Sequence, residues 1–167
     1  QPNTTNGFAA QTANAPIITY EENLLILAEA GLRSQGFATG LEHLNNYRAF
    51  MNGGGYLVNA DPAQIRYEAY VAEDFNSGGL ENTAGLNPDD ALLKEILEER
   101  YVTFFGQIEG FNDVRRTTGE TTVKVQVPPN IGTEIPGRFL YPQTEIDRNA
   151  NVPNPIPGLF EATDINK

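Results

Sequence analysis

Three helix-start signals, each followed by an apolar stripe at helical spacing, constrain the fold of this chain more than any other feature. Thr19 and Glu22 have the S/T-x-x-E spacing of a capping box, and the same spacing recurs at Thr39. Asn87 precedes a proline and two acids, which together favour the first turn of a helix. Because apolar residues follow each signal at helical intervals, we predict a mainly α-helical fold with helices at about 20–35, 40–52 and 88–105.

Glycines determine how the first two helices connect. Gly36 is predicted to end the first helix and Gly53 to Gly55 the second, because glycine accepts the positive φ that helix ends often need. The short connection between the two predicts an antiparallel helical hairpin. Such hairpins are the unit of tetratricopeptide-like repeats, although no second copy recurs at a fixed period in this sequence.

Two further helices carry weaker signals. Asp61 and Pro62 predict the start of a short helix that extends to Phe75, since Asp caps a helix and Pro suits its first turn. The apolar and charged residues that precede Gly119 predict a fourth helix at about 109–117.

The rest of the chain is predicted to be mostly irregular. The valines that alternate from Val123 to Val127 favour a strand, and they predict a short β-hairpin at about 122–141. The polar residues 1–16 are predicted to be linker, and 142–167 an irregular tail rich in proline and asparagine.

Composition excludes several classes of function. The formal net charge of -11 disfavours nucleic acid as a partner, because like charges repel. The chain has no cysteine, so disulfides, thiol nucleophiles and cysteine-based metal sites are excluded. No apolar run approaches the ~20 residues of a membrane helix, and the first residues lack the pattern of a signal peptide.

Catalytic motifs are not evident, and we expect neither a metal nor a cofactor. His43 is the single histidine, and no Ser or Cys motif accompanies it to suggest a catalytic triad. Adjacent acids such as Glu98 and Glu99 invite comparison with glycoside hydrolases, which act with two carboxylates across a cleft. Neighbours on a helix do not face each other, so a solvated helix face is the favoured interpretation.

Aromatic residues in and beside the glycine-rich middle of the chain are the best candidates for ligand binding. Aromatic rings stack on sugars, and loops are where binding residues concentrate, although core packing is the alternative role for each ring. The predicted ligand-binding residues are Tyr56, Tyr67, Tyr70 and Phe75.

Ion pairs are the predicted role of the arginines in the fourth helix. Bidentate Arg–carboxylate contacts would join that helix to the long helix before it. The predicted structural ion pairs involve Arg115 and Arg116 with Glu98, Glu99 and Glu109, and anion binding by the two arginines is the alternative.

Four stretches, taken in order, resemble the carboxyl-terminal part of the SusD/RagB family. They are Thr19–Ala30 (TYEENLLILAEA), Leu93–Gly106 (LKEILEERYVTFFG), Glu109–Arg116 (EGFNDVRR) and Ile135–Glu145 (IPGRFLYPQTE). The resemblance extends over about 17–155, and its specificity lies in the order of the set. The chain departs from the pattern at Phe111 and Val114, where the family often has aromatic residues, with Trp frequent at the first.

The resemblance implies a fold and a function that spacing does not show. It implies a helical SusD-like domain in 17–167, with tetratricopeptide-like helix pairs and irregular loops. It implies a non-catalytic lipoprotein on the cell surface, at the outer membrane of Bacteroidetes-type bacteria. Such a protein captures glycans, or oligopeptides in some members, for a SusC-like TonB-dependent transporter.

Family members are considerably longer than this chain. The resemblance therefore implies an amino-terminal part of the same protein as a further partner, and a lipid anchor on a cysteine in that absent part. Two alternatives remain open: an independent helical-repeat adaptor that binds a protein or peptide, and an acid-dependent glycoside hydrolase.

Overall fold

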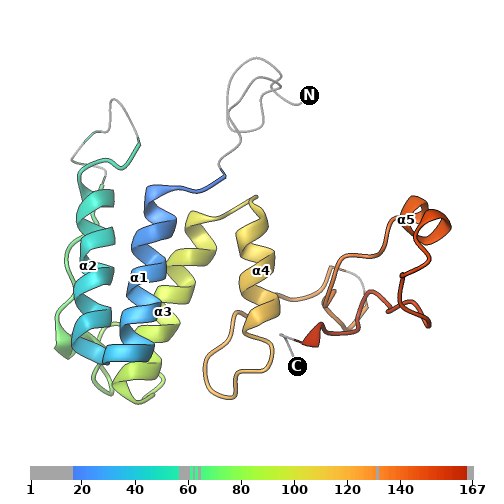
Figure 1. Cartoon of the computed structure of the whole chain (residues 1–167). Helices are drawn as coiled ribbons and strands as arrows, with labels where there is room; N and C mark the ends of the chain where they lie inside the picture. The colour runs from blue at the N-terminus through green and yellow to red at the C-terminus, as the bar shows by residue number, and fades with distance from the viewer. Residues whose placement is uncertain (1–16, 57–60, 62, 64, 131, 165–167) are drawn as a thin grey trace.

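The computed structural model describes residues 17–56, 61, 63, 65–130 and 132–164. Within these residues the fold is mainly helical and contains no strand, which confirms the predicted class in its broad form (Figure 1). The helices are α1 (Tyr20–Gln35), α2 (Phe37–Asn52), the 3-10 helix η1 (Ala72–Phe75), α3 (Pro88–Thr103), α4 (Ile108–Arg116) and α5 (Gln143–Arg148).

Helices α1 and α2 form the antiparallel hairpin that the sequence predicts. The Thr19 hydroxyl caps α1 by accepting a hydrogen bond from the Glu22 amide at 3.3 Å. The second helix starts earlier than predicted, because Gly36 is its N-cap and Thr39 lies inside it. Gly40 lets the two helices approach closely: a Cβ there would lie 2.6 Å from the Leu32 Cβ.

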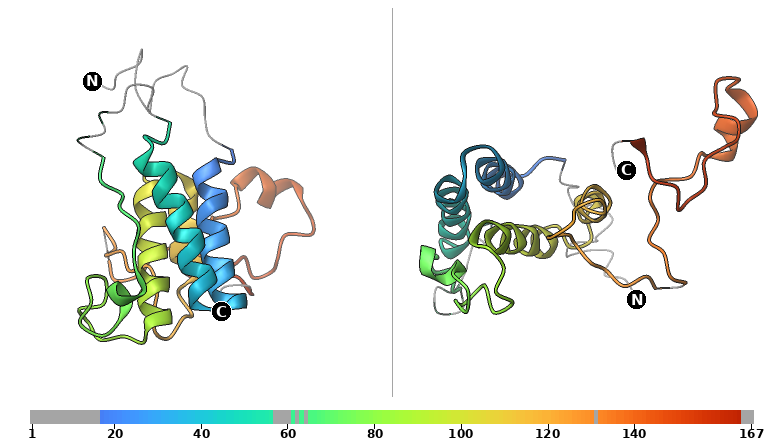
Figure 2. Two further views of the ribbon diagram at one scale, coloured as in Figure 1. Left: turned by 90° about the vertical axis from the view of Figure 1, so that its left-hand side faces the viewer. Right: turned by 90° about the horizontal axis from the view of Figure 1, so that it is seen from below.

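The four long helices lie side by side, and α3 packs against both helices of the hairpin (Figures 1 and 2). Phe104 ends α3, and a short connection returns the chain into α4. Apolar side chains from α1, α2 and α3 fill the space between these helices. The large, fully buried side chains include Leu25, Leu44, Leu92 and Ile96, together with Phe75 of η1 and Phe104 at the end of α3.

The helix predicted from Asp61 to Phe75 is mostly wrong, although 62 and 64 lie outside the described residues. Residues 65–71 instead run extended along α2, and only Ala72–Phe75 forms a 3-10 turn. The reason is tertiary: the Asn45 side chain donates to the Tyr70 carbonyl at 2.9 Å and accepts from the Tyr70 amide at 2.8 Å. A side chain of α2 thus supplies the bonds that a helix would have made. We call 65–71 the strap.

Residues 76–86 form a loop, and a buried side chain, that of Asn82, holds it in shape. Asn82 is only 1% exposed. Its amide donates to the carbonyls of Phe75 and Leu86, and its side-chain oxygen accepts from the Leu86 amide, at distances of 2.7–2.8 Å. These three bonds give partners to backbone groups that no helix or strand pairs in this segment.

The β-hairpin predicted at about 122–141 is not present in the described part of that range. Val123 is buried, but the Val125 amide donates to the Thr117 hydroxyl rather than to a second strand. Gly137 and Arg138 instead contact residues 159–162. The Gly137 amide donates to the Leu159 carbonyl, and the Arg138 side chain donates to the Glu161 and Ala162 carbonyls. The alternating valines predicted an extended segment, but they could not predict which residues that segment would contact.

The tail beyond 142 is irregular, as predicted, except for α5, which the sequence analysis missed. We call the described residues after α4, 117–130 and 132–164, the arm; it carries α5 and extends from α4 away from the other helices (Figures 1 and 2). The helices of the described residues are all too short or too polar to cross a membrane.

Candidate functional site

Three of the four predicted ligand-binding residues lie in a row along α2. Tyr67 donates its amide to the Asn52 side chain, Tyr70 pairs with Asn45, and the Phe75 ring packs at 5.7 Å from that of Phe37. The row follows from the extended strap, which runs back along the helix.

Their surroundings differ in what they leave free for a ligand. Phe75 is fully buried, so its role is core packing. Tyr67 is half-buried, and Tyr56 is 62% exposed. Tyr56 lies outside the row: its ring packs 5.4 Å from that of Phe50, and its hydroxyl accepts from the Tyr20 amide. Tyr70 is half-buried as well, but the Arg48 guanidinium covers its ring, so Tyr56 and Tyr67 are the better candidates of the four.

Tyr70 belongs to a group that we call the Tyr70 cluster: the buried Arg48, Glu95 and Glu99 with the half-buried Tyr70 and Glu81. The Arg48 guanidinium carbon lies 3.8 Å from the centre of the Tyr70 ring, a cation–π contact. Its Nη1 donates to Glu99 Oε1 at 2.8 Å, and its Nε donates to the Glu68 carbonyl. The Tyr70 hydroxyl lies 2.7 Å from Glu95 Oε1 and 3.0 Å from Glu81 Oε1.

Burial shapes the protonation of this cluster. It raises the pKa of Glu95 to about 7, against the opposing Tyr70 hydrogen bond, and the charges of nearby acids raise it further. Burial also raises the pKa of Glu99, while Arg48 opposes the shift. The pKa of the Tyr70 hydroxyl is raised by burial and by Glu95, so it remains a donor. The Tyr70 cluster is thus acid-rich and holds protons.

The predicted ion pairs of Arg115 and Arg116 are wrong in their partners. Arg116 reaches back to α1, where Nη1 and Nη2 donate to the two Glu29 oxygens at 2.7 and 2.6 Å, and its Nε donates to Asp113. Arg115 donates instead to the Gly137 carbonyl and to Asn112. No signal within α3 or α4 indicated Glu29, because the pair joins residues far apart in sequence.

The three predicted glutamates also differ from the prediction. Glu98 pairs with Lys94 at the surface, and Glu99 with Arg48. Glu109 forms no ion pair with any described residue.

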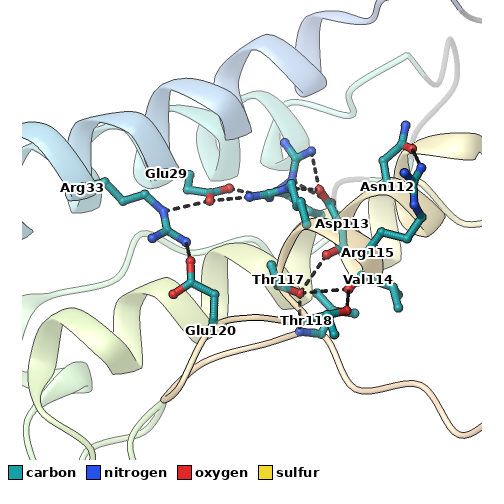
Figure 3. A network of polar contacts seen from close by, with 12 residues as sticks. Glu29, Arg33, Asn112, Asp113, Val114, Arg115, Thr117, Thr118 and Glu120 are labelled. Atoms are coloured by element: carbon teal, nitrogen blue, oxygen red, sulfur yellow. Dashed lines mark hydrogen bonds and ion pairs between the residues drawn. The ribbon is translucent and has the colours of Figure 1, made fainter. Parts of the chain in front are cut away.

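Arg116 is the centre of a second ionic group, the Arg116 cluster: Arg33, Arg100 and Arg116 with Glu29, Asp113 and Glu120 (Figure 3). Arg100 and Asp113 form a buried bidentate pair at 2.8 and 3.0 Å. Burial would raise the pKa of Glu29, but its bonds to Arg116 and Arg33 outweigh burial and lower it. Three cations therefore face three anions.

A groove lies between α3, α4 and the arm. One cavity of about 660 Å³ is lined by Leu97, Tyr101 and residues 122–128. A second, of about 610 Å³, shares Tyr101 with the first and adds Phe111 and Phe160. Mostly apolar concave surfaces with a few polar groups are typical of small-molecule sites. No local sequence pattern indicates this groove, because residues far apart in the chain line it.

The lining of the groove includes charged and aromatic groups. Lys94 and Glu98 lie at one cavity, Glu134 at the other, and the Tyr101 side chain is 42% exposed. An aromatic face beside hydrogen-bonding groups suits a carbohydrate. Within the described residues, no group of histidines and carboxylates has the arrangement to hold a metal ion.

Comparisons of this chain with protein-family models, with curated proteins and with solved structures gave no match.

Proposed function

We propose that this chain is the carboxyl-terminal part of a SusD/RagB-like binding protein, which captures glycans at the cell surface without transforming them. The observation that carries the proposal is the ordered set of four stretches, 19–30, 93–106, 109–116 and 135–145. Each contributes to one packing unit.

The contacts between these stretches support the proposal. Glu29 of the first stretch holds Arg116 of the third, and Arg100 of the second holds Asp113 of the third. Arg115 then holds the Gly137 carbonyl of the fourth stretch. Sequence features that meet in one packing unit are explained by a shared structural role.

The proposal includes a tetratricopeptide-like arrangement. α1 and α2 form one helical hairpin, and α3 and α4 form a second through the short Phe104–Gln107 connection. Hairpins stacked in this way make a rigid platform, and the loops beside it are suited to hold a ligand. Oligopeptides are the alternative ligand class.

Two surfaces are candidates for the glycan. One comprises the accessible rings of Tyr56 and Tyr67, and the other is the groove at Tyr101. Both offer an aromatic ring for stacking, but the groove also offers concavity and charged groups, so we place the ligand there.

The test is retention of polysaccharides by the purified 167-residue chain in native affinity gels, over a panel of neutral and acidic glycans. We expect retention by at least one glycan and no release of reducing ends. Tyr101→Ala should abolish retention, whereas Tyr67→Ala should leave it nearly unchanged. Phe105→Ala is the matched control, because Phe105 is 80% exposed but lines neither cavity.

Release of reducing ends would replace the proposal with the hydrolase alternative. Retention of peptides but of no glycan would favour the helical adaptor. Loss of retention in Tyr67→Ala alone would move the ligand to the strap.

The proposal extends to the partner and the location. A SusC-like TonB-dependent transporter would receive the ligand at the outer membrane, where a lipid anchor in the amino-terminal part would hold the protein. Co-purification of an identified transporter of that class with the native protein is the expected result.

A further inference from the structure

We propose that Glu81 and Glu95 share one proton across the Tyr70 hydroxyl, and that this proton fastens the strap to α2 and α3, so that the strap loosens at alkaline pH. This inference is independent of any glycan. It concerns a conformational device built from the contacts of the Tyr70 cluster.

The Tyr70 hydroxyl has one hydrogen but contacts two carboxyl groups. A tyrosine hydroxyl has one hydrogen to donate, and an ionised carboxylate only accepts. The Tyr70 hydroxyl nevertheless lies within hydrogen-bond distance of two carboxyl oxygens, Glu95 Oε1 at 2.7 Å and Glu81 Oε1 at 3.0 Å. Both contacts are satisfied only if one of the two carboxyls is protonated and donates to the hydroxyl. The two short distances therefore support a proton on one glutamate.

Negative groups outnumber positive groups in the Tyr70 cluster. Three carboxyls, Glu81, Glu95 and Glu99, surround the Tyr70 cluster, and Arg48 is the one cation that contacts them among the described residues. Glu95 and Glu99 are each only 8% exposed, so water screens their repulsion weakly. A shared proton removes one of the two excess negative charges.

The surroundings of the proton come from every element that packs there. The titratable and charged groups that face it are Tyr47 and Arg48 of α2, Tyr67 and Tyr70 of the strap, Glu81 of the loop, and Glu95, Glu98 and Glu99 of α3. The raised pKa of Glu95, about 7, agrees with a proton that is held at neutral pH. Loss of the shared proton is the step that matters.

The shared proton holds the strap to α3 and to the loop through the Tyr70 side chain. Tyr70 is the only residue of the strap whose side chain bonds to both α3 and the loop in the described structure. The backbone of the strap is attached to α2 separately, through Asn45, Arg48 and Asn52. Loss of the proton therefore breaks one Tyr70 contact and restores a repulsion between Glu81 and Glu95, while the α2 contacts keep the strap near its place.

Limited proteolysis with trypsin reads this device directly. Arg66 is exposed in the strap, so cleavage after it reports loosening, and Lys124 in the irregular segment after α4 serves as an internal reference. We expect the ratio of cleavage at Arg66 to cleavage at Lys124 to rise severalfold between pH 6 and pH 8.5.

Three variants separate the proposal from general instability. Glu95→Gln, which supplies a permanent amide donor to Tyr70, should keep the ratio low at every pH. Tyr70→Phe should give a high ratio already at pH 6. Glu98→Gln, the exposed neighbour on α3, should behave like the original chain.

Several outcomes would overturn the proposal. A flat ratio in the original chain, or the same rise in Glu95→Gln, would remove the role of the proton. Closure of the strap at pH 8.5 by added calcium, reversed by EDTA, would replace the proton by a bound cation. Should Glu95→Gln not fold, carbon-13 NMR of the glutamate carboxyls in the original chain decides: complete ionisation of both Glu81 and Glu95 below pH 5 refutes the shared proton.

Discussion

The two ionic clusters each contain buried charges, and they compensate these charges in opposite ways. The Arg116 cluster places three guanidiniums against three carboxylates and joins α1, α3 and α4. The Tyr70 cluster places one guanidinium against three carboxyls and joins α2, α3 and the strap. Removing a charge from water is costly in both, and countercharge offsets the cost only in the first.

The protonation of the two clusters differs accordingly. Arginine contacts lower the pKa of Glu29 in the Arg116 cluster, while burial raises the pKa of Glu95 in the Tyr70 cluster to about 7. The first cluster is thus expected to be insensitive to pH near neutrality, and the second to titrate there. Five predictions test this contrast.

The largest effect is expected from Asp113→Ala. Asp113 is 1% exposed, and its removal leaves the Arg100 guanidinium buried without its bidentate partner. We expect a loss of about 3–5 kcal/mol in the free energy of unfolding, measured by urea denaturation. The double variant Arg100→Met with Asp113→Leu should recover much of this loss, and failure to recover any would contradict an ionic origin.

A smaller and pH-dependent effect is expected from Arg48→Met. The variant removes the one cation of the Tyr70 cluster and its bond to the strap carbonyl of Glu68. We expect a loss of about 2–3 kcal/mol at pH 8 and a smaller loss at pH 6, where protonated carboxyls need less compensation. Equal losses at the two pH values would show that the two clusters do not differ as described.

Glu29→Gln tests the Arg116 cluster from its acidic side. The folded state lowers the pKa of Glu29 below 4.5, so its contribution to stability is present above that pH and is lost as pH falls through the folded value. We expect a loss of about 1–2 kcal/mol at pH 7 that shrinks in acid.

Glu95→Gln should show the reverse: since folding raises the Glu95 pKa, the original chain loses stability as pH rises from 4.5 towards about 7, and the amide variant should not. Thermal unfolding from pH 3 to 8 measures both profiles.

The smallest effect is expected from Lys94→Met, which breaks an ion pair outside both clusters. The Lys94 and Glu98 side chains are 47% and 55% exposed, so water and salt screen their contact. We expect a change below about 0.5 kcal/mol at any salt concentration. A change as large as that of Glu29→Gln would mean that burial does not set the scale of these effects.

Local patterns predicted the helices well, because capping and apolar periodicity act over neighbouring residues. Thr19 caps α1 and Asn87 caps α3 as expected, and glycines end α1 and α2. The prediction failed where distant groups compete for the backbone. Asn45 holds Tyr70 extended in place of a helix, and the end of the chain, rather than a second strand, pairs with Gly137 and Arg138.

The candidate site was predicted less well than the fold. The sequence indicated that tyrosines near the glycine-rich middle were available, and Tyr56 and Tyr67 remain so, but Phe75 is part of the core. The groove at Tyr101 had no local signal, because residues far apart in the chain line it.

The sequence by itself determined where α1 and α3 begin, that a second helix follows α1 in a hairpin, and that charged residues are plentiful on α3 and α4. Only the tertiary structure decided which charges are buried together, and therefore which carboxyls keep a proton. The reason is that helix formation depends on contacts within a few residues, whereas burial of Glu29 against Arg116, or of Glu95 against Tyr70, depends on how separate elements pack.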